Sequence, residues 1–138
     1  MIRIILSIFF VLHGLVHLLY FGQSRRLFEL QPGMVWPDGA WAFSRLLGDQ
    51  TTRMLAGILL VLAAIGFVVG GAGLLMKQDW WRPVIVSAAG FSTILYFFFW
   101  DGSLQNLSDK GGIAILINVA ILAAVLIFQW PTIEIINK

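Results

Sequence analysis

The sequence predicts an all-α integral membrane protein, a four-transmembrane-helix up-down-up-down bundle with a long ordered first loop. Of its 138 residues, 59% are hydrophobic and only 12% are charged, which is more apolar surface than a water-soluble domain of this size can bury. The mean hydropathy is +0.90, and the apolar residues form four runs long enough to cross a hydrocarbon core of about 30 Å. A single membrane domain over residues 1–138 follows.

The first apolar run covers residues 2–22. A secretory signal peptide has a shorter apolar centre and a cleavage site of small residues, whereas this run is long and carries His13, His17 and Tyr20 in its second half. We therefore expect a helix that the protein retains.

Three further runs predict helices over residues 53–76, 83–100 and 112–130. Pro83 falls in the first turn of the third run, where a missing N–H costs nothing, and Pro131 closes the fourth. The tryptophans lie outside the runs or at their ends, as in an aromatic belt at the membrane surface. They are Trp36, Trp41, Trp80, Trp81, Trp100 and Trp130.

The connections predict the topology. Residues 77–82 and 101–111 are short connections, so the helices that they join are expected to be antiparallel neighbours. Both termini then lie on one side of the membrane, called side A, and the first and third connections lie on side B. Side A carries Arg3, Lys77, Arg82 and Lys138, and side B carries Arg25, Arg26, Arg45, Arg53 and Lys110. The side A cations lie in short segments, which favours cytoplasmic termini.

The first connection, residues 23–52, is too long for a turn and too aromatic for a flexible linker. Turn residues at 32–33 and 37–39 let the chain reverse direction, and residues 40–47 could form a short interfacial helix. We expect an ordered lid over the side B end of the bundle. The alternative is a loop that only anchors the protein at the membrane surface.

The lid hypothesis makes specific predictions about contacts. Trp36 or Trp41 is expected near the level of Tyr20, because aromatic side chains favour the membrane interface. Arg25 or Arg26 is expected to pair with a loop carboxylate, and the candidates are Glu29 and Asp38.

Small residues predict one helix contact. Gly66, Gly70 and Gly73 lie on one face of the second helix, and such spacing lets two backbones approach closely. Packing against a neighbouring helix of the same chain is the first interpretation, and self-association into a homo-oligomer is the second.

Polar residues inside the apolar runs are few, and each is costly in lipid, so they indicate where a site would be. His13, His17 and Tyr20 form one stripe on the first helix, which should face the bundle interior. Tyr96 and Asn118 are predicted at a depth close to that of His17. A polar chamber that opens to side B follows.

The candidate ligand-binding residues are the members of this chamber and of its mouth: His13, His17, Tyr20, Tyr96, Asp101, Asn118 and Arg53. One interpretation is that the histidines only orient helices through hydrogen bonds, which are worth about 0.6 kcal/mol each on average in membrane bundles. The other is a site for a lipid- or quinone-like molecule, because such sites are aromatic pockets with a few convergent polar groups.

Metal and nucleic-acid chemistry find little support in the sequence. There is no cysteine, and the segment from His13 to His17 lacks the glutamate of a zinc-protease helix. A bis-histidine haem would need a histidine on another helix, and both histidines of the sequence lie in the first apolar run. The sequence therefore identifies no cofactor. The net charge of +2 predicts no nucleic-acid partner.

Three sequence segments carry a family resemblance: His13-Gly14-Leu15-Val16-His17-Leu18-Leu19-Tyr20-Phe21, Phe99-Trp100-Asp101-Gly102 and Ile117-Asn118-Val119-Ala120-Ile121-Leu122. They resemble a group of small bacterial four-helix membrane proteins that are DoxX-like in the broad sense. The resemblance implies the four-helix fold and a prokaryotic cytoplasmic (inner) membrane. DoxX-like proteins in this sense are linked to quinone-dependent oxidation, but no catalytic motif matches residue by residue.

Three function classes remain open. The first is a ligand-binding protein, with a lipid or quinone near His17, that serves a larger membrane process. The second is a structural or partner-binding subunit of a membrane assembly, and the third is a small membrane enzyme. The sequence carries no nucleotide-binding loop and so predicts no energy-coupling unit.

Overall fold

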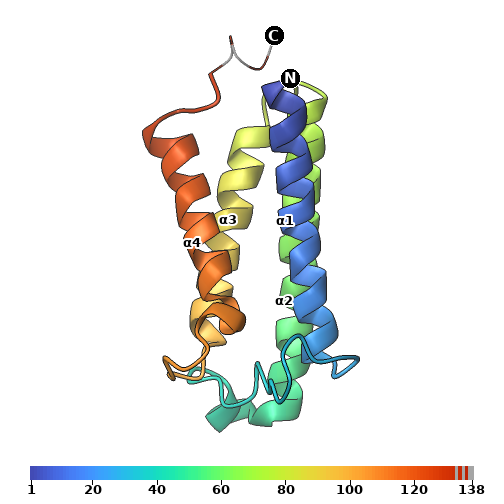
Figure 1. Cartoon of the computed structure of the whole chain (residues 1–138), viewed down its shortest axis with the longest axis vertical. Helices are drawn as coiled ribbons and strands as arrows, with labels where there is room; N and C mark the ends of the chain where they lie inside the picture. The colour runs from blue at the N-terminus through green and yellow to red at the C-terminus, as the bar shows by residue number, and fades with distance from the viewer. Residues whose placement is uncertain (133, 135, 137–138) are drawn as a thin grey trace.

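The computed structural model describes residues 1–132, 134 and 136, so Lys138, one of the side A cations, lies outside the described residues. In this described part, four helical segments are long and apolar enough to cross a membrane, and there is no strand (Figure 1). They are α1 (Ile2–Ser24), α2 (Ser44–Leu75), α3 (Trp81–Phe98) and a fourth segment made of the π-helical η1 (Ser108–Gly112), α4 (Ile113–Leu122) and the π-helical η2 (Ala123–Ile127). The predicted four-helix membrane fold is confirmed.

The second helix begins earlier than the predicted residue 53. Polar residues 44–52 continue the helix outside the apolar run, which hydropathy does not detect. Gly48 interrupts this extension with φ +74° and ψ 161°. Glycine adopts this conformation readily because it has no Cβ to clash with the backbone. The lid is therefore shorter than the predicted 23–52, and we use the name for residues 25–43.

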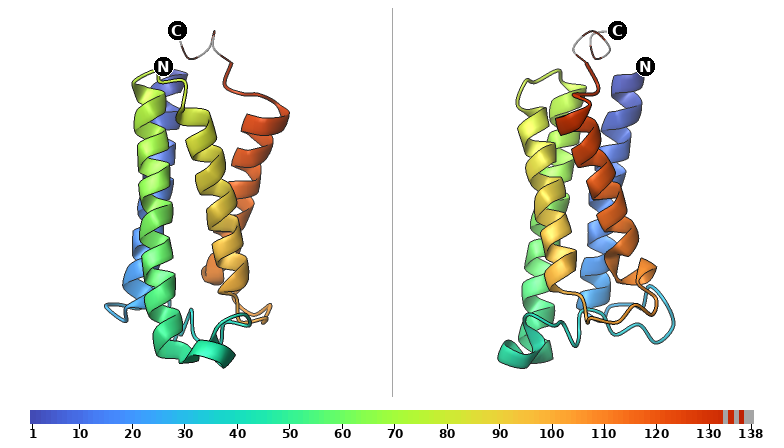
Figure 2. Two further views of the ribbon diagram at one scale, coloured as in Figure 1. Left: turned by 180° about the vertical axis from the view of Figure 1, so that it is seen from behind. Right: turned by 90° about the vertical axis from the view of Figure 1, so that its left-hand side faces the viewer.

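The chain runs up, down, up and down. Met1, the turn between α2 and α3, and the end of η2 lie at one end of the bundle, which is side A (Figure 1). The lid and the connection between α3 and η1 lie at the other end, which is side B (Figure 2). The topology thus agrees with that expected from the short connections.

The four helices are unequally spaced. The backbone of α1 packs on α2, α2 packs on α3, and α3 packs on α4, but no Cα of α1 lies within 8 Å of a Cα of α3 or α4. Side chains therefore span the space between α1 and the α3–α4 pair, which we call the gap.

Glycines bring α1 and α2 together. A Cβ on Gly14 would lie 2.9 Å from the Cβ of Phe67 and 3.0 Å from the carbonyl oxygen of Ala64. On the other helix, a Cβ on Gly71 would lie 3.0 Å from the carbonyl oxygen of Ser7. The absence of side chains at these positions sets the α1–α2 distance, as small residues do in membrane helix pairs.

The predicted glycine face of α2 packs on α3 of the same chain. A Cβ on Gly66 would lie 3.0 Å from the Cβ of Ala88, and one on Gly70 would lie 2.5 Å from Cδ1 of Ile85. Gly73 contacts the ring of Trp80 in the turn that follows α2. The first interpretation of this face, packing within one chain, is therefore confirmed.

Candidate functional site

Four buried polar residues link α1, α3 and α4 across the gap. His13 Nε2 lies 2.8 Å from Asn118 Oδ1, and Asn118 Nδ2 lies 2.8 Å from Ser92 Oγ. Ser92 Oγ lies 2.7 Å from His17 Nε2, while His17 Nδ1 lies 2.9 Å from the carbonyl oxygen of His13. The four side chains thus form a closed circuit, which begins and ends on α1.

The direction of every hydrogen bond in this circuit follows from its chemistry. A carbonyl oxygen only accepts, so His17 Nδ1 donates to the backbone oxygen of His13. A neutral His17 then accepts at Nε2, and the only proton in reach is that of the Ser92 hydroxyl. Because that proton is used, Asn118 must donate its amide to Ser92 and accept from His13. This arrangement gives each of these bonds a donor and an acceptor.

The circuit leaves His17 closed to a ligand. His17 is fully buried and both of its ring nitrogens are bonded, while His13 is 5% exposed. Neither histidine lines any of the five cavities considered below. The expected hydrogen bond between Asn118 and one of the histidines is present, but the space beside His17 is filled by side chains rather than open as the chamber predicted.

Ser92 joins two members of the predicted site, and the sequence did not single it out. A serine in an apolar helix commonly bonds to its own backbone, as Thr93 does to the carbonyl oxygen of Ala89 at 2.8 Å. The phase of Ser92 on α3 relative to Tyr96 was an available signal, because the two residues lie four positions apart and so face the same side.

Two tyrosine rings lie between the circuit and the lid, and a tryptophan of the lid packs on both. The ring centroids of Tyr20 and Tyr96 are 5.2 Å apart, and Trp36 of the lid lies 5.3 Å from Tyr20 and 5.9 Å from Tyr96. Trp36 therefore lies near the level of Tyr20, as predicted. The Tyr20 hydroxyl donates to the carbonyl oxygen of Asp109 at 2.7 Å, which ties α1 to the connection before η1.

Two members of this aromatic cluster carry polar atoms without a partner. Tyr96 is fully buried and Trp36 is 3% exposed. Neither the Tyr96 hydroxyl nor the Trp36 Nε1–H makes a hydrogen bond within the described part of the chain. Most buried polar side chains in proteins are bonded, so two such donors on neighbouring rings require an explanation.

Ion pairs hold the lid closed. Asp38 receives a two-pronged contact from Arg53, with Nε to Oδ1 at 2.6 Å and Nη2 to Oδ2 at 2.5 Å, and a second pair from Arg26 at 2.7 Å. The predicted pairing of Arg26 with a loop carboxylate is thus confirmed. The buried Gln23 of α1 adds neutral bonds: its Nε2 donates to the carbonyl oxygen of Met34, and its Oε1 accepts from the Leu30 N–H.

Two cavities lie beside the lid, at the side B end of the bundle, and we call this region the mouth. One, of about 190 Å³, lies under the lid and is the more polar of the two: its lining mixes apolar residues such as Met34 and Trp36 with the charged Asp101, Asp109 and Lys110. The other, of about 170 Å³, is almost wholly apolar and includes Tyr96. Lys110 lines both cavities, and its Nζ is paired with Asp101 at 2.6 Å. Both residues predicted at the mouth are therefore paired within the chain, Asp101 with Lys110 and Arg53 with Asp38.

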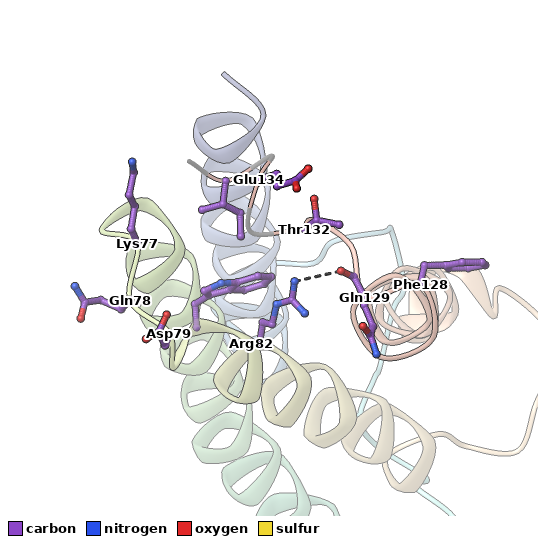
Figure 3. A pocket seen from close by; sticks show the side chains of 10 residues that line it. Lys77, Gln78, Asp79, Arg82, Phe128, Gln129, Thr132 and Glu134 are labelled. Atoms are coloured by element: carbon purple, nitrogen blue, oxygen red, sulfur yellow. Dashed lines mark hydrogen bonds between the residues drawn. The ribbon is translucent and has the colours of Figure 1, made fainter. Parts of the chain in front are cut away.

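The widest of the five cavities lies at the opposite end of the bundle. It measures about 710 Å³ on side A, between the turn after α2 and the chain that follows η2 (Figure 3). The guanidinium of Arg82 spans it, donating to the carbonyl oxygens of Gln129, at 3.2 Å, and Pro131. Arg82 thus holds the chain that follows η2 against the start of α3, which is a structural role.

Fold and geometry together define a small multi-pass helical membrane protein. Among the described residues, no three histidine, aspartate or glutamate side chains are placed to hold one metal ion. No family model, curated protein or solved structure matches the chain.

Proposed function

We propose that this protein binds an amphipathic molecule of the lipid or quinone class at its side B mouth, as an accessory to a larger membrane process. The observation that carries the proposal is the pair of cavities that share Lys110, one under the lid with charged and polar groups in its lining and one almost wholly apolar beside Tyr96. An amphipathic molecule presents the same two characters, a polar head and an apolar tail. Each cavity is smaller than a typical pocket for a whole small molecule, which suits a head group and the start of a tail.

The unpartnered donors support a head group that accepts hydrogen bonds. Trp36 lines the polar cavity and Tyr96 lines the apolar one, and each keeps a buried donor without a partner in the described chain. A quinone carbonyl or a lipid ester would supply the missing acceptor. Leaving a donor buried without a partner costs about 1–3 kcal/mol, which the ligand would recover.

The histidine circuit contributes to this function by fixing the helices that form the mouth. His13 and His17 hold α1 at a set distance from Ser92 of α3 and Asn118 of α4. In this proposal the ligand lies above the circuit, between it and the lid, and does not contact the bonded ring nitrogens of His17.

Binding of a short-chain ubiquinone analogue to the purified protein in detergent tests the proposal. A quinone quenches nearby tryptophans, so wild-type fluorescence should fall saturably; Trp36→Phe should remove the part of the change that Trp36 reports, and Trp100 of the apolar cavity should report the rest. Tyr96→Phe should raise the dissociation constant about tenfold, which corresponds to a loss of about 1.4 kcal/mol of binding free energy. Trp80→Phe, on side A, is the matched control and should bind as the wild type does. Mass spectrometry of co-purified molecules separates a quinone from a lipid.

The stability of Tyr96→Phe gives an independent answer. If the hydroxyl of Tyr96 serves no ligand, its removal should stabilise the protein, because an unpartnered buried group is lost. If a molecule from the membrane occupies the site, the variant should be less stable in native lipid and more stable after delipidation. Unsaturable quenching that is equal in Trp36→Phe and Trp80→Phe, with no co-purified molecule, would refute the proposal.

A second candidate function is a structural or partner-binding membrane subunit. The closed hydrogen-bond circuit favours it, because each ring nitrogen of His17 is already bonded within the bundle. Under this alternative, His17→Leu lowers thermal stability in detergent and leaves ligand protection unchanged. Under the ligand proposal, the same variant also weakens ubiquinone binding, because the mouth loses its fixed geometry.

The proposed location is a prokaryotic cytoplasmic membrane with cytoplasmic termini. The support is the DoxX-like resemblance of the helices and the short cationic segments on side A, such as the turn with Lys77 and Arg82. In this orientation the lid faces the outside of the cell. Labelling of a single cysteine introduced at Gly33, an exposed lid position, would report the side.

A further inference from the structure

An apolar groove begins at the side B end of α2, on the surface that faces lipid. A hollow of about 400 Å³ lies between α1 and α2, and its lining includes Phe21, Met54, Gly57 and Leu62. Gly57 contributes the depth, because it places no side chain between the two helices. Leu62 is 53% exposed, so the hollow is open to the membrane.

The groove continues along α2 towards its middle. A second hollow, of about 480 Å³, lies between α2 and α3, and its lining includes Leu62, Gly66 and Phe91. Leu62 lines both hollows, which makes them neighbours on the surface of α2. From Met54 to Gly66 the helix rises by about 18 Å at 1.5 Å per residue. One leaflet of the hydrocarbon core is about 15 Å thick, so the groove has the length of one leaflet.

A cation lies at the side B end of the groove. Arg25 lines the first hollow, is exposed, and makes no ion pair with any described residue. Three other side B cations pair within the chain: Arg26 and Arg53 with Asp38, and Lys110 with Asp101. In the described part of the chain, no acidic side chain lines this hollow. Arg25 is thus available to an anion from outside the chain.

We propose that the groove is a binding site for an anionic phospholipid of the side B leaflet. The phosphate pairs with Arg25 at the membrane surface, and one acyl chain lies along α2 over Gly57 and past Leu62. A guanidinium at a phosphate is a charge-assisted contact of the strong kind, and a groove lined by apolar side chains suits an acyl chain. The site lies on the outer side of α1 and α2, apart from the mouth proposed to hold the amphipathic ligand.

Native mass spectrometry tests this site after reconstitution into vesicles of mixed phosphatidylcholine and phosphatidylglycerol. The wild type should retain phosphatidylglycerol in excess of its share of the vesicle. Arg25→Gln should lose that preference while a lipid stays bound. Ile58→Trp should lose the bound lipid itself, because Ile58 is 54% exposed and lines the groove, so a larger side chain fills it without entering the core.

Two matched variants act as controls. Arg45→Gln removes another exposed side B cation that makes no ion pair with any described residue and lines neither hollow. Gly90→Leu adds bulk on α3 at a position where a Cβ meets nothing within 4 Å. Both should retain phosphatidylglycerol as the wild type does, and all variants should keep the wild-type helical circular dichroism.

The outcomes that overturn the proposal are distinct from a failure of the proposed function. An equal loss of preference in Arg25→Gln and Arg45→Gln would show diffuse attraction between the lipid and the surface charge. Unchanged lipid retention in both Arg25→Gln and Ile58→Trp would show only annular lipid. The dissociation constant of the ubiquinone analogue, read by native mass spectrometry because Ile58→Trp adds a fluorophore, should be the same in both variants as in the wild type.

Discussion

Two interfaces of α1 differ in how they are built. Against α2, the helix packs backbone to backbone, with Gly14 facing Phe67 and Gly71 facing the carbonyl oxygen of Ser7. Against α3 and α4, no Cα comes within 8 Å, and polar and aromatic side chains span the gap. The first interface depends on the absence of side chains and the second depends on their length.

The difference shows where stability and chemistry reside. Close packing between α1 and α2 gains dispersion energy, and this gain is the main source of helix association in lipid. The gap instead holds the histidine circuit and the ring of Tyr96, whose hydroxyl has no partner among the described residues. Substitutions in the gap should therefore act through hydrogen bonds, while substitutions in the close interface should act through packing.

The largest expected effect is in the close interface. Gly14→Leu should lower the free energy of unfolding by about 3 kcal/mol, because the new side chain meets the backbone oxygen of Ala64, which cannot move aside as a side chain does. Thermal unfolding in detergent measures the loss. Gly90→Leu adds the same bulk where a Cβ meets nothing within 4 Å and should be close to neutral. Equal effects of the two would show that the α1–α2 distance is not set by Gly14.

The next effect is in the gap. Asn118→Leu should lower stability by about 2 kcal/mol, because it leaves the donor of His13 without an acceptor and removes the donor to Ser92. The double variant His13→Leu/Asn118→Leu should lose less than the sum of the single variants, since the two residues share one bond. Additive losses in this double-mutant cycle would contradict the circuit.

The lid should respond more weakly. Asp38→Asn should lower stability by about 1 kcal/mol, because Asp38 pairs with both Arg26 and Arg53 but remains partly exposed. Hydrogen–deuterium exchange should speed up over residues 25–43 and stay unchanged in the middle of the four helices. Asp79→Asn on side A is the control. Exchange that is equally fast in wild type and Asp38→Asn would mean that these pairs do not hold the lid.

The smallest expected difference compares adjacent hydroxyls on α3. Ser92→Ala should cost about 1 kcal/mol, because Ser92 bridges His17 and Asn118 across the gap. Thr93→Ala should change stability by less than about 0.5 kcal/mol, since the Thr93 hydroxyl bonds only to the carbonyl oxygen of Ala89 in its own helix. A larger loss of stability for Thr93→Ala than for Ser92→Ala would contradict the bridging role of Ser92.

The helices were predictable because the bilayer imposes one length scale on each apolar run. Hydropathy did not detect residues 48–52, which are helical but polar, or the start of the fourth segment at Ser108; residues 44–47 are helical as the expected interfacial helix over 40–47 predicts, although that helix begins four residues later. Helix formation there depends on tertiary contacts of the lid and of the mouth, which hydropathy does not represent. Gly48 marks the break within α2, but a lone glycine in a polar segment does not by itself predict one.

The candidate site was predictable in part. The helical phase placed His13 and His17 on one stripe, and depth placed Asn118 near the level of His17, whereas its direct hydrogen bond is to the deeper His13 and it reaches His17 only through Ser92. Ser92 was missed because one hydroxyl among several in apolar helices carries no distinctive pattern. The closure of the space beside His17 was also beyond the sequence, since it depends on how Phe67 and Tyr96 fill the gap.

The one-way circuit has a spectroscopic consequence for the two histidines. His13 carries its proton on Nε2, whereas His17 carries its proton on Nδ1, so neutral imidazoles four residues apart are opposite tautomers. In solution a neutral histidine exchanges between both forms. Here the carbonyl oxygen of His13 fixes the tautomer of His17, and Asn118 Oδ1 fixes that of His13, so nitrogen-15 NMR in lipid should resolve two separate, unexchanging pairs of ring signals. A single proton added to His17 would reverse one bond: Nε2 would donate to Ser92 Oγ, and the Ser92 hydroxyl proton would need another acceptor, while Asn118 could keep donating to Ser92.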